Sequence, residues 1–195
     1  MKQQFINLLM QTGCPMAEQI INNLERLGFF EAPASTKYHL SQPGGLLQHS
    51  VSVCNAALKL REIAVAEHPE LDAKLPVKSV ILTALLHDVC KAEIYKTGTR
   101  NVKNPTTGQW EAVTVYETDY SHFPCGHGEK SVIRLLMWGV PLTPDEVLAI
   151  RWHMSAWDLA QNFEASGNLN AAKDKTPLVA LLQTADMFSS GIMEF

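Results

Sequence analysis

Apolar residues recur every three to four positions along most of this chain, and that spacing is typical of amphipathic helices. Residues 2–28 follow the pattern, but Gly13-Cys14-Pro15 divides them into two predicted helices because proline is unfavourable inside a helix. The pattern predicts further helices over about 46–68, 77–90, 126–138, 143–154 and 177–189. The helix near residue 143 has a strong start signal, since the sequence Thr-Pro-Asp-Glu supplies an N-cap, a first-position proline and a capping-box glutamate.

Other stretches lack helical spacing. Residues 29–45 contain prolines and paired glycines and are expected to be irregular, and the polar residues 155–176 are expected to form a loop. Between about 96 and 122, β-prone segments flank Asn104-Pro105-Thr106-Thr107-Gly108, which predicts a β-hairpin. The predicted fold class is therefore all-α, a helical bundle with a small inserted β-hairpin. N-terminal helices in 1–42 are expected to pack on a main domain formed by 43–195.

The composition indicates a folded protein, because 46% of the 195 residues are hydrophobic and only 18% are charged. The net charge of −4 disfavours an extended nucleic-acid track, since binding a phosphate backbone needs many cations. No apolar run approaches the roughly 18 residues that a membrane helix needs, and the N-terminus lacks a secretory signal, so no membrane association is expected. The 4 cysteines are scattered without a CxxC pair, which favours reduced thiols and a cytoplasmic location.

The unusual feature is the placement of ionisable residues at the ends of apolar helices. The apolar run 80–86 leads directly into His87-Asp88, and the apolar run 178–185 leads into Asp186. Three further segments each supply a histidine, namely His49, His127 and His153. Any one of these residues alone is more often a core or surface residue than a ligand. Together they are explained if they converge on divalent metal, because a buried carboxylate without a partner is costly and a metal needs several N and O ligands.

The ordered set His49 … His87-Asp88 … Asp186 resembles the H…HD…D pattern of the HD-domain metal-dependent phosphohydrolases. The sequence HDVCK at 87–91 is similar to the family's HD-x-x-K, and GGLLQHS at 44–50 is similar to its GGL-x-x-HS opening. The resemblance covers about 43–190, and the strings at 44–50 and 126–128 are most similar to HD domains of the 3′–5′ exoribonuclease type. Cys90 stands where a glycine is usual, and no GYP motif is present, which argues against cyclic dinucleotides as the substrate.

The resemblance implies a role for each matched residue. His49, His87, Asp88 and Asp186 would hold one metal ion, and Asp88 would bridge to a second ion held by His127 and His153. Asp88 and Lys91 would be the catalytic residues, with Lys91 contacting a phosphate oxygen or orienting the attacking water. The ligand types suit Fe, Mn, Ni, Co or Zn and do not choose among them.

Several other residues are candidates with weaker support. Lys130 and Arg151 are candidate phosphate contacts, with a solvated face as the equally good alternative. We expect His39 and His68 to be exposed, and we give no role to His122 or Cys125. Glu129 is a possible neighbour of the ligands without an assigned role. Trp152 and Trp157 could stack on a base, but we expect both to belong to the core.

The sequence therefore predicts a phosphohydrolase that acts on a small phosphate-bearing substrate, a nucleotide or short oligonucleotide, through a binuclear site. Two alternatives stay open: a di-iron oxygenase of HD-like fold, and a non-catalytic nucleotide sensor that would be favoured by missing ligands. The hairpin is expected to rim or cover the site and to bring Lys96, Arg100 and Lys103 near it; the alternative is a dimer contact or an excursion without a role. The sequence leaves the oligomeric state open.

Overall fold

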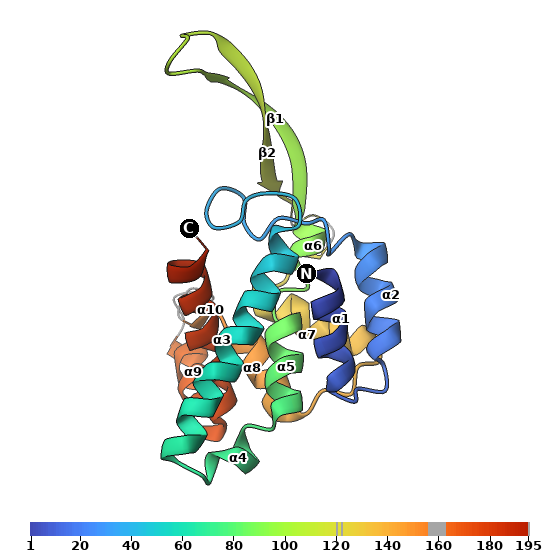
Figure 1. Cartoon of the computed structure of the whole chain (residues 1–195), viewed down its shortest axis with the longest axis vertical. Helices are drawn as coiled ribbons and strands as arrows, with labels where there is room; N and C mark the ends of the chain where they lie inside the picture. The colour runs from blue at the N-terminus through green and yellow to red at the C-terminus, as the bar shows by residue number, and fades with distance from the viewer. Residues whose placement is uncertain (120, 122, 156–162, 195) are drawn as a thin grey trace.

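A computed structural model describes residues 1–119, 121, 123–155 and 163–194. The chain is mainly helical and carries one antiparallel pair of strands. Figure 1 shows the helices gathered into a bundle from which the strand pair projects. In chain order the elements are α1 (Lys2–Gln11), α2 (Ala17–Leu27), α3 (Gly45–Glu67), α4 (Leu71–Lys74), α5 (Val77–Leu86), α6 (Lys91–Ile94), β1 (Tyr95–Lys103), β2 (Trp110–Thr118), α7 (His127–Met137), α8 (Pro144–Trp152), α9 (Phe163–Lys175), α10 (Pro177–Phe188) and a π-helical turn, η2 (Ser189–Met193).

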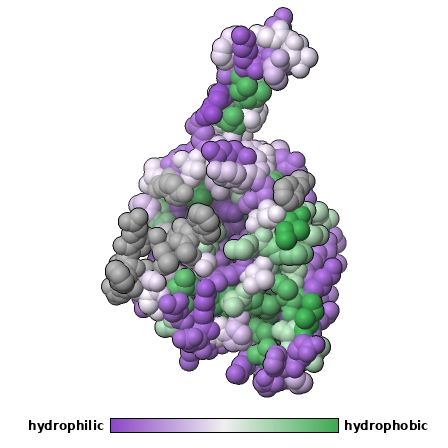
Figure 2. Space-filling model, turned by 90° about the vertical axis from the view of Figure 1, so that its left-hand side faces the viewer, coloured by the Kyte–Doolittle hydropathy of each residue, from purple (hydrophilic) through white to green (hydrophobic). Residues whose placement is uncertain are grey.

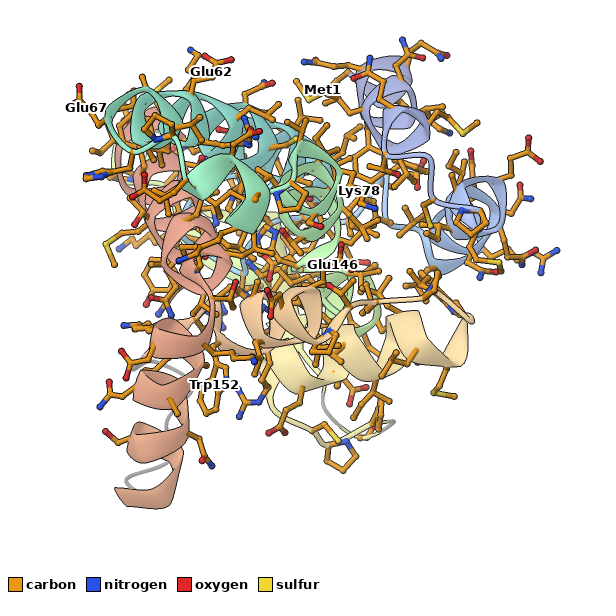
Figure 3. All side chains as sticks on the ribbon, turned by 90° about the horizontal axis from the view of Figure 1, so that it is seen from below. Met1, Glu62, Glu67, Lys78, Glu146 and Trp152 are labelled. Atoms are coloured by element: carbon orange, nitrogen blue, oxygen red, sulfur yellow. The ribbon has the colours of Figure 1, made fainter. Side chains whose placement is uncertain are left out.

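The centre of the bundle is formed by α3, α5 and α10, which pack on one another. Helix α5 is buried on every face from Ser79 to Leu86, as its nearly uniform apolar sequence predicts. The N-terminal helices contribute to the same core, because Phe5 of α1 contacts Phe29 and Phe30 edge-on or tilted at ring-centroid distances of 5.5 and 5.6 Å. Figure 3 shows Glu62 and Glu67 of α3 pointing away from the bundle.

Two glycines allow close backbone contacts that position later site residues. A Cβ atom on Gly45 would collide with the carbonyl oxygen of Leu40, so the first turn of α3 lies directly against the preceding irregular segment. A Cβ atom on Gly128 would collide with the carbonyl oxygen of Arg151, so α7 begins directly against the end of α8. Both contacts occur within one helical turn of a histidine, His49 or His127, and hold that part of the helix in place.

The start of α8 has the capping box that the sequence predicts. The Thr143 hydroxyl accepts a hydrogen bond from the Glu146 backbone N–H at 3.3 Å, and the Glu146 carboxylate accepts one from the Thr143 N–H at 2.8 Å. Glu146 is buried, and Figure 3 shows it in the interior of the view, between the helices. The helix breaks near Gly13 and near residue 143 are thus where local sequence rules place them.

The predicted loop at 155–176 is wrong for residues 163–175, which form α9. The sequence there contains Gly167 and asparagines, which are poor helix formers. The helix nevertheless buries Leu169 and Ala172 and packs on α8 and α10. Tertiary packing therefore outweighs a weak intrinsic preference.

Strands β1 and β2 form the predicted hairpin, paired in register from Tyr95 opposite Thr118 to Lys103 opposite Trp110. The Asn104 side chain accepts hydrogen bonds from the backbone N–H groups of Thr106 and Thr107, which is the expected turn chemistry. The expectation that the hairpin rims or covers the site, bringing Lys96, Arg100 and Lys103 near it, is wrong. Figure 1 shows it extending away from the bundle, and no hairpin residue of the described chain lines the pocket beside the site.

Across the described residues, none of the helices combines the length and the apolar character required to cross a lipid bilayer.

Candidate metal centre

Histidine and aspartate side chains from separate parts of the fold meet at the centre of the bundle. They come from α3, the turn after α5, the start of α7, the end of α8, and α10. The imidazole rings form a row with centroid distances of 5.3 Å for His49–His87, 4.8 Å for His87–His153 and 5.4 Å for His127–His153. The structure brings together the full predicted ligand set: His49, His87, Asp88, His127, His153 and Asp186.

One group of inward-facing atoms surrounds His49 Nε2. This nitrogen lies 3.3 Å from His87 Nε2, 3.4 Å from Asp88 Oδ2 and 3.2 Å from Asp186 Oδ1. His87 Nε2 and Asp88 Oδ2 are 3.3 Å apart. Ligand atoms held about 2.0–2.2 Å from one ion, at tetrahedral or octahedral angles, lie roughly 3–3.5 Å from each other. The spacing in this group therefore fits one metal ion.

A second group surrounds the other oxygen of Asp88. Asp88 Oδ1 lies 2.5 Å from His127 Nε2 and 3.3 Å from His153 Nε2. The His153 Nε2 atom is buried and has no hydrogen-bond partner among the described residues. The carboxylate of Asp88 thus presents one oxygen to each group, which is the arrangement of a bridging ligand between paired metal ions.

The outward-facing nitrogens of the histidines are held by the protein. His87 Nδ1 donates to the Ala84 carbonyl oxygen at 2.9 Å, and His153 Nδ1 donates to the Ile150 carbonyl oxygen at 2.7 Å. A carbonyl oxygen can only accept, so Nδ1 carries a proton in each ring and Nε2 is the nitrogen that faces the cluster. Both carbonyl partners lie three residues earlier in the chain, which means the ends of α5 and α8 orient their own histidines.

His49 and His127 have different outer partners. Both carboxylate oxygens of Glu194 lie 3.0–3.1 Å from His49 Nδ1, and the Glu194 side chain is 2% exposed. The Cys90 sulfur lies 3.2 Å from His127 Nδ1. Burial raises the pKa of the Cys90 thiol to about 12, so this partner is an uncharged thiol. The residue that departs from the usual glycine therefore touches a candidate ligand.

Burial and charge act in opposite directions at the cluster. Burial of Asp88 favours its neutral form, but the charges of Lys91, His87 and His127 outweigh burial and hold the pKa of Asp88 well below its usual range. Burial likewise opposes protonation of His49, but hydrogen bonds to Asp186, Asp88 and Glu194 raise its pKa well above the ordinary value. The cluster therefore has ionised carboxylates that attract positive charge, which is the electrostatic requirement for a cation site.

Lys91 adds a cation at the edge of the cluster. Its side chain is 10% exposed, and its Nζ atom lies 2.6 Å from Asp88 Oδ2. Burial favours neutral lysine, but Asp88 and other nearby acidic groups raise the pKa of Lys91 above its ordinary value, so the ammonium stays charged. The short helix α6 begins at Lys91, and this places the ammonium between the carboxylate and the adjacent pocket.

The other candidate phosphate contacts lie elsewhere. Lys130 is 2% exposed and its ammonium lies over the Phe123 ring at 5.6 Å. Arg151 stacks on Trp152 at 4.1 Å and pairs with Glu129 at 2.7 Å. Neither cation lines the pocket beside the cluster, so the structure does not support their predicted role. Trp152 is buried as expected, whereas His122 and Trp157 lie outside the described residues.

Sequence reasoning missed two residues of this region. His39 was expected to be exposed, but its ring centroid lies 5.1 Å from that of His49, and its Nε2 atom is buried 3.9 Å from Glu194. Glu194 follows η2, which packs against α3 and carries the carboxylate to His49. Neither residue belongs to a periodic apolar helix, so the signal that identified the other ligands does not apply to them. His68 is exposed as expected.

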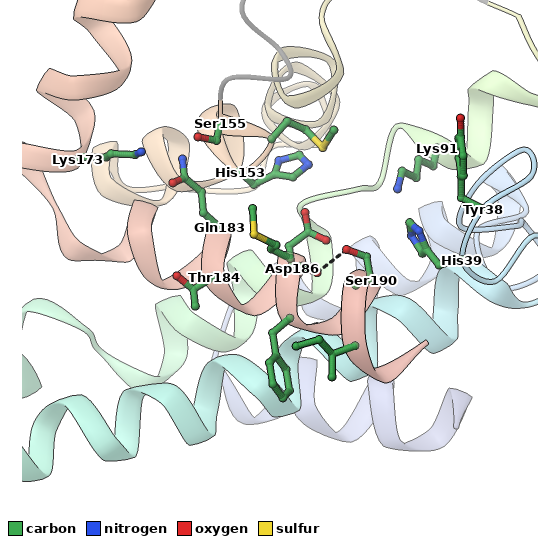
Figure 4. A pocket seen from close by; sticks show the side chains of 15 residues that line it. Tyr38, His39, Lys91, His153, Ser155, Lys173, Gln183, Thr184, Asp186 and Ser190 are labelled. Atoms are coloured by element: carbon green, nitrogen blue, oxygen red, sulfur yellow. Dashed lines mark hydrogen bonds between the residues drawn. The ribbon is translucent and has the colours of Figure 1, made fainter. Parts of the chain in front are cut away.

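A cavity of about 1010 Å³ opens beside the cluster. Figure 4 shows Asp186 and His153 near its middle, with Lys91 and His39 to one side and Lys173, Gln183 and Ser155 to the other. The face of the bundle that carries α9 and α10 is hollowed, and hydrophobic residues gather beside the hollow (Figure 2). Two of the candidate ligands, Asp186 and His153, thus line a cavity that can admit a small molecule.

No protein-family model, curated protein or solved structure matches the chain. The function must therefore be argued from the chemistry of the cluster. Four histidines and two aspartates form a cluster whose groups lie close enough to hold metal ions, and His153, Asp186 and Lys91 connect it to the pocket. Such a set can bind divalent cations and attract an anionic ligand.

Proposed function

We propose that this chain is a binuclear metal-dependent phosphohydrolase of the HD-domain type, acting on a nucleotide or short oligonucleotide. The observation that carries the proposal is Asp88, whose oxygens face separate histidine groups while Lys91 approaches from the pocket. One ion would be held by His49, His87, Asp88 and Asp186. The other would be held by Asp88, His127 and His153. The buried Nε2 of His153 supports this assignment, because it lies 3.3 Å from Asp88 Oδ1 without a hydrogen bond and is available as a ligand.

The donor set suits Fe, Mn, Ni, Co or Zn, which accept imidazole and carboxylate ligands. When bound, two such ions supply Lewis acidity toward phosphoryl oxygens and an attacking water of lowered pKa. The chain's own residues would supply the positioning and the charge stabilisation that the reaction also needs. Asp88 would be a ligand to both ions, the Nδ1 partners hold the imidazoles in place, and the Lys91 ammonium would stabilise negative charge that develops on the phosphoryl group.

Lys91 and the pocket also bear on the alternatives. An oxygen-activating di-iron site needs no ammonium beside its ligands, whereas a phosphoryl substrate is attracted by one. A non-catalytic sensor would not require a complete ligand set, but every predicted ligand is present in the cluster. These observations favour phosphoester hydrolysis over both other functions.

The test is anaerobic purification followed by metal analysis and a phosphoester panel. We expect up to two divalent ions per chain and metal-dependent release of phosphate or nucleotide. Oxygen consumption by an iron-loaded protein without phosphoester hydrolysis would favour the oxygenase. Tight nucleotide binding without turnover in any of the five metals would favour the sensor.

A further inference from the structure

The cavity beside the cluster is larger than a single phosphate requires. Its volume of about 1010 Å³ is at the upper end of ligand pockets, which typically span roughly 300–1,000 Å³. It extends from the ligand residues Asp186 and His153 to Lys173 in the last turn of α9. A ligand that fills it must therefore reach well beyond the metal centre.

Part of the cavity wall is apolar. Met154, Met187, Phe188 and Ile192 line it, and three of them are substantially exposed, with 66% for Met187, 41% for Phe188 and 60% for Ile192. Large apolar side chains that gather at an open pocket indicate a binding surface. An aromatic ring and flexible methionines suit a flat body such as a nucleobase, because every base offers a face for stacking.

A cation lies on each side of the ligand residues that line the cavity. Lys91 is at the ligand end, and Figure 4 shows Lys173 on the opposite side of Asp186 and His153, with its side chain directed toward Gln183. Within the described part of the chain, Lys173 has no ion-pair partner, whereas Lys91 is paired with Asp88. The cavity thus presents two cations on opposite sides of Asp186 and His153, together with an apolar surface.

We propose that the substrate has two phosphate groups separated by one nucleoside, with the reacting phosphate at the metal centre and the second at Lys173. The simplest such molecule is a dinucleotide with a 5′-terminal phosphate. This proposal rests on the proposed function. Water attacks the internucleotide phosphorus, the bond to the 3′ oxygen of the first nucleoside breaks, and that oxygen takes a proton. Each dinucleotide and one water give two nucleoside 5′-monophosphates.

The test compares 5′-phosphorylated diadenylate with diadenylate that lacks the terminal phosphate, using metal-loaded protein. The wild type is expected to show about tenfold higher kcat/KM for the phosphorylated form, because a charge-assisted hydrogen bond at a partly exposed site has an effect of this order. Lys173→Ala should remove the preference while leaving kcat/KM for diadenylate within about twofold. Lys175→Ala is the matched control, since Lys175 is on the same helical turn but does not line the cavity beside the cluster.

Two further measurements complete the design. Phe188→Ala should lower kcat/KM for both dinucleotides, because it shortens the apolar wall that both share. Binding of the phosphorylated dinucleotide to protein held in chelator, measured by calorimetry, should weaken about tenfold in Lys173→Ala and be unchanged in Lys175→Ala. This readout is independent of hydrolysis.

The outcomes separate the two proposals. Equal turnover and equal binding of the two dinucleotides by the wild type would overturn the second phosphate site, as would a Lys173→Ala protein that loses both substrates equally. Absence of hydrolysis together with Lys173-dependent binding would overturn the proposed function and retain the two-phosphate site. Hydrolysis without any dependence on Lys173 would retain the proposed function and overturn the two-phosphate site.

Discussion

Asp88 is the residue on which both halves of the candidate centre depend. Its side chain is 1% exposed, and its oxygens face the separate histidine groups. We expect Asp88→Ala to retain less metal after dialysis than any single histidine variant, because it removes a ligand from both ions. Elemental analysis of the purified proteins measures this. His68→Ala is the control, since His68 is exposed and remote from the cluster; unchanged metal content in Asp88→Ala would contradict bridging.

A variant of Lys91 distinguishes metal binding from catalysis. An ammonium is not a metal ligand, so Lys91→Ala should keep its metal while kcat falls by about 10²–10³, the usual effect of removing one electrostatic donor. Metal analysis and steady-state kinetics on the same preparation test this. If the variant loses metal in proportion to activity, Lys91 supports the cluster through Asp88 and has no direct role in turnover.

Glu194 is the residue-scale feature that no sequence pattern revealed. A carboxylate that accepts a hydrogen bond from a ligating histidine orients the ring and makes it more basic. We expect Glu194→Gln to weaken metal binding at the His49 site by about 10–100-fold, with Glu194→Asp partly restoring it. Competition with a chromophoric chelator measures the affinity. Equal affinity in wild type and Glu194→Gln would show that Glu194 only fills space behind His49.

The residues predicted from sequence share a signal that Glu194 and His39 lack. His87 and Asp88 directly follow the apolar helix α5, and Asp186 lies within the mainly apolar α10, where an ionisable group needs an explanation. Glu194 and His39 lie in irregular or π-helical segments, and only tertiary packing brings them to His49. Periodicity can identify a polar residue on a buried helix, but it cannot identify a partner supplied by a separate segment.

At the scale of elements, the sequence predicted helix starts and breaks that depend on neighbouring residues, but it did not predict the direction in which the hairpin projects. The capping box at Thr143 and the break near Gly13 could be predicted because their causes lie within a few residues. The helix at Phe163–Lys175 could not, since it depends on burying Leu169 and Ala172 against other helices. The hairpin was predicted in place, but its direction depends on how β1 continues from α6, which the sequence pattern does not specify.

The hairpin can be tested by shortening it. Thr97 pairs with Tyr116, so replacing residues 98–115 with a short Gly-Ser turn keeps the base of the hairpin and its register. Because the removed residues project from the bundle, we expect metal content and dinucleotide turnover to stay within about twofold of wild type. Metal analysis and kinetics check this. A large loss of either would show that the distal hairpin contributes to the site.

At the scale of the whole molecule, the proposed metal ions would join helices that are distant in sequence. The candidate ligands come from α3, the end of α5, α7, the end of α8 and α10, so a bound ion connects most of the bundle. Ligands that bind only the folded state stabilise it, by about 4 kcal/mol at a thousandfold excess over Kd. We therefore expect chelation to lower the melting temperature, measured by circular dichroism.

The stabilisation of the fold by bound metal should increase with pH. The folded-state pKa values of His49 and His153 are raised, because their carboxylate partners outweigh burial. In metal-free protein these protons stabilise the fold below about pH 6.5, the ordinary value for histidine, and that contribution is lost as the pH rises through the raised values. Metal binding must release the same protons, so metal affinity increases with pH over this interval. Asp88 and Asp186, with lowered pKa values, stay ionised throughout. The difference in melting temperature between metal-loaded and metal-free protein should consequently widen from pH 6 to pH 8. A constant difference would show that no proton leaves the cluster when metal binds, and the ligand assignment of His49 and His153 would then be wrong.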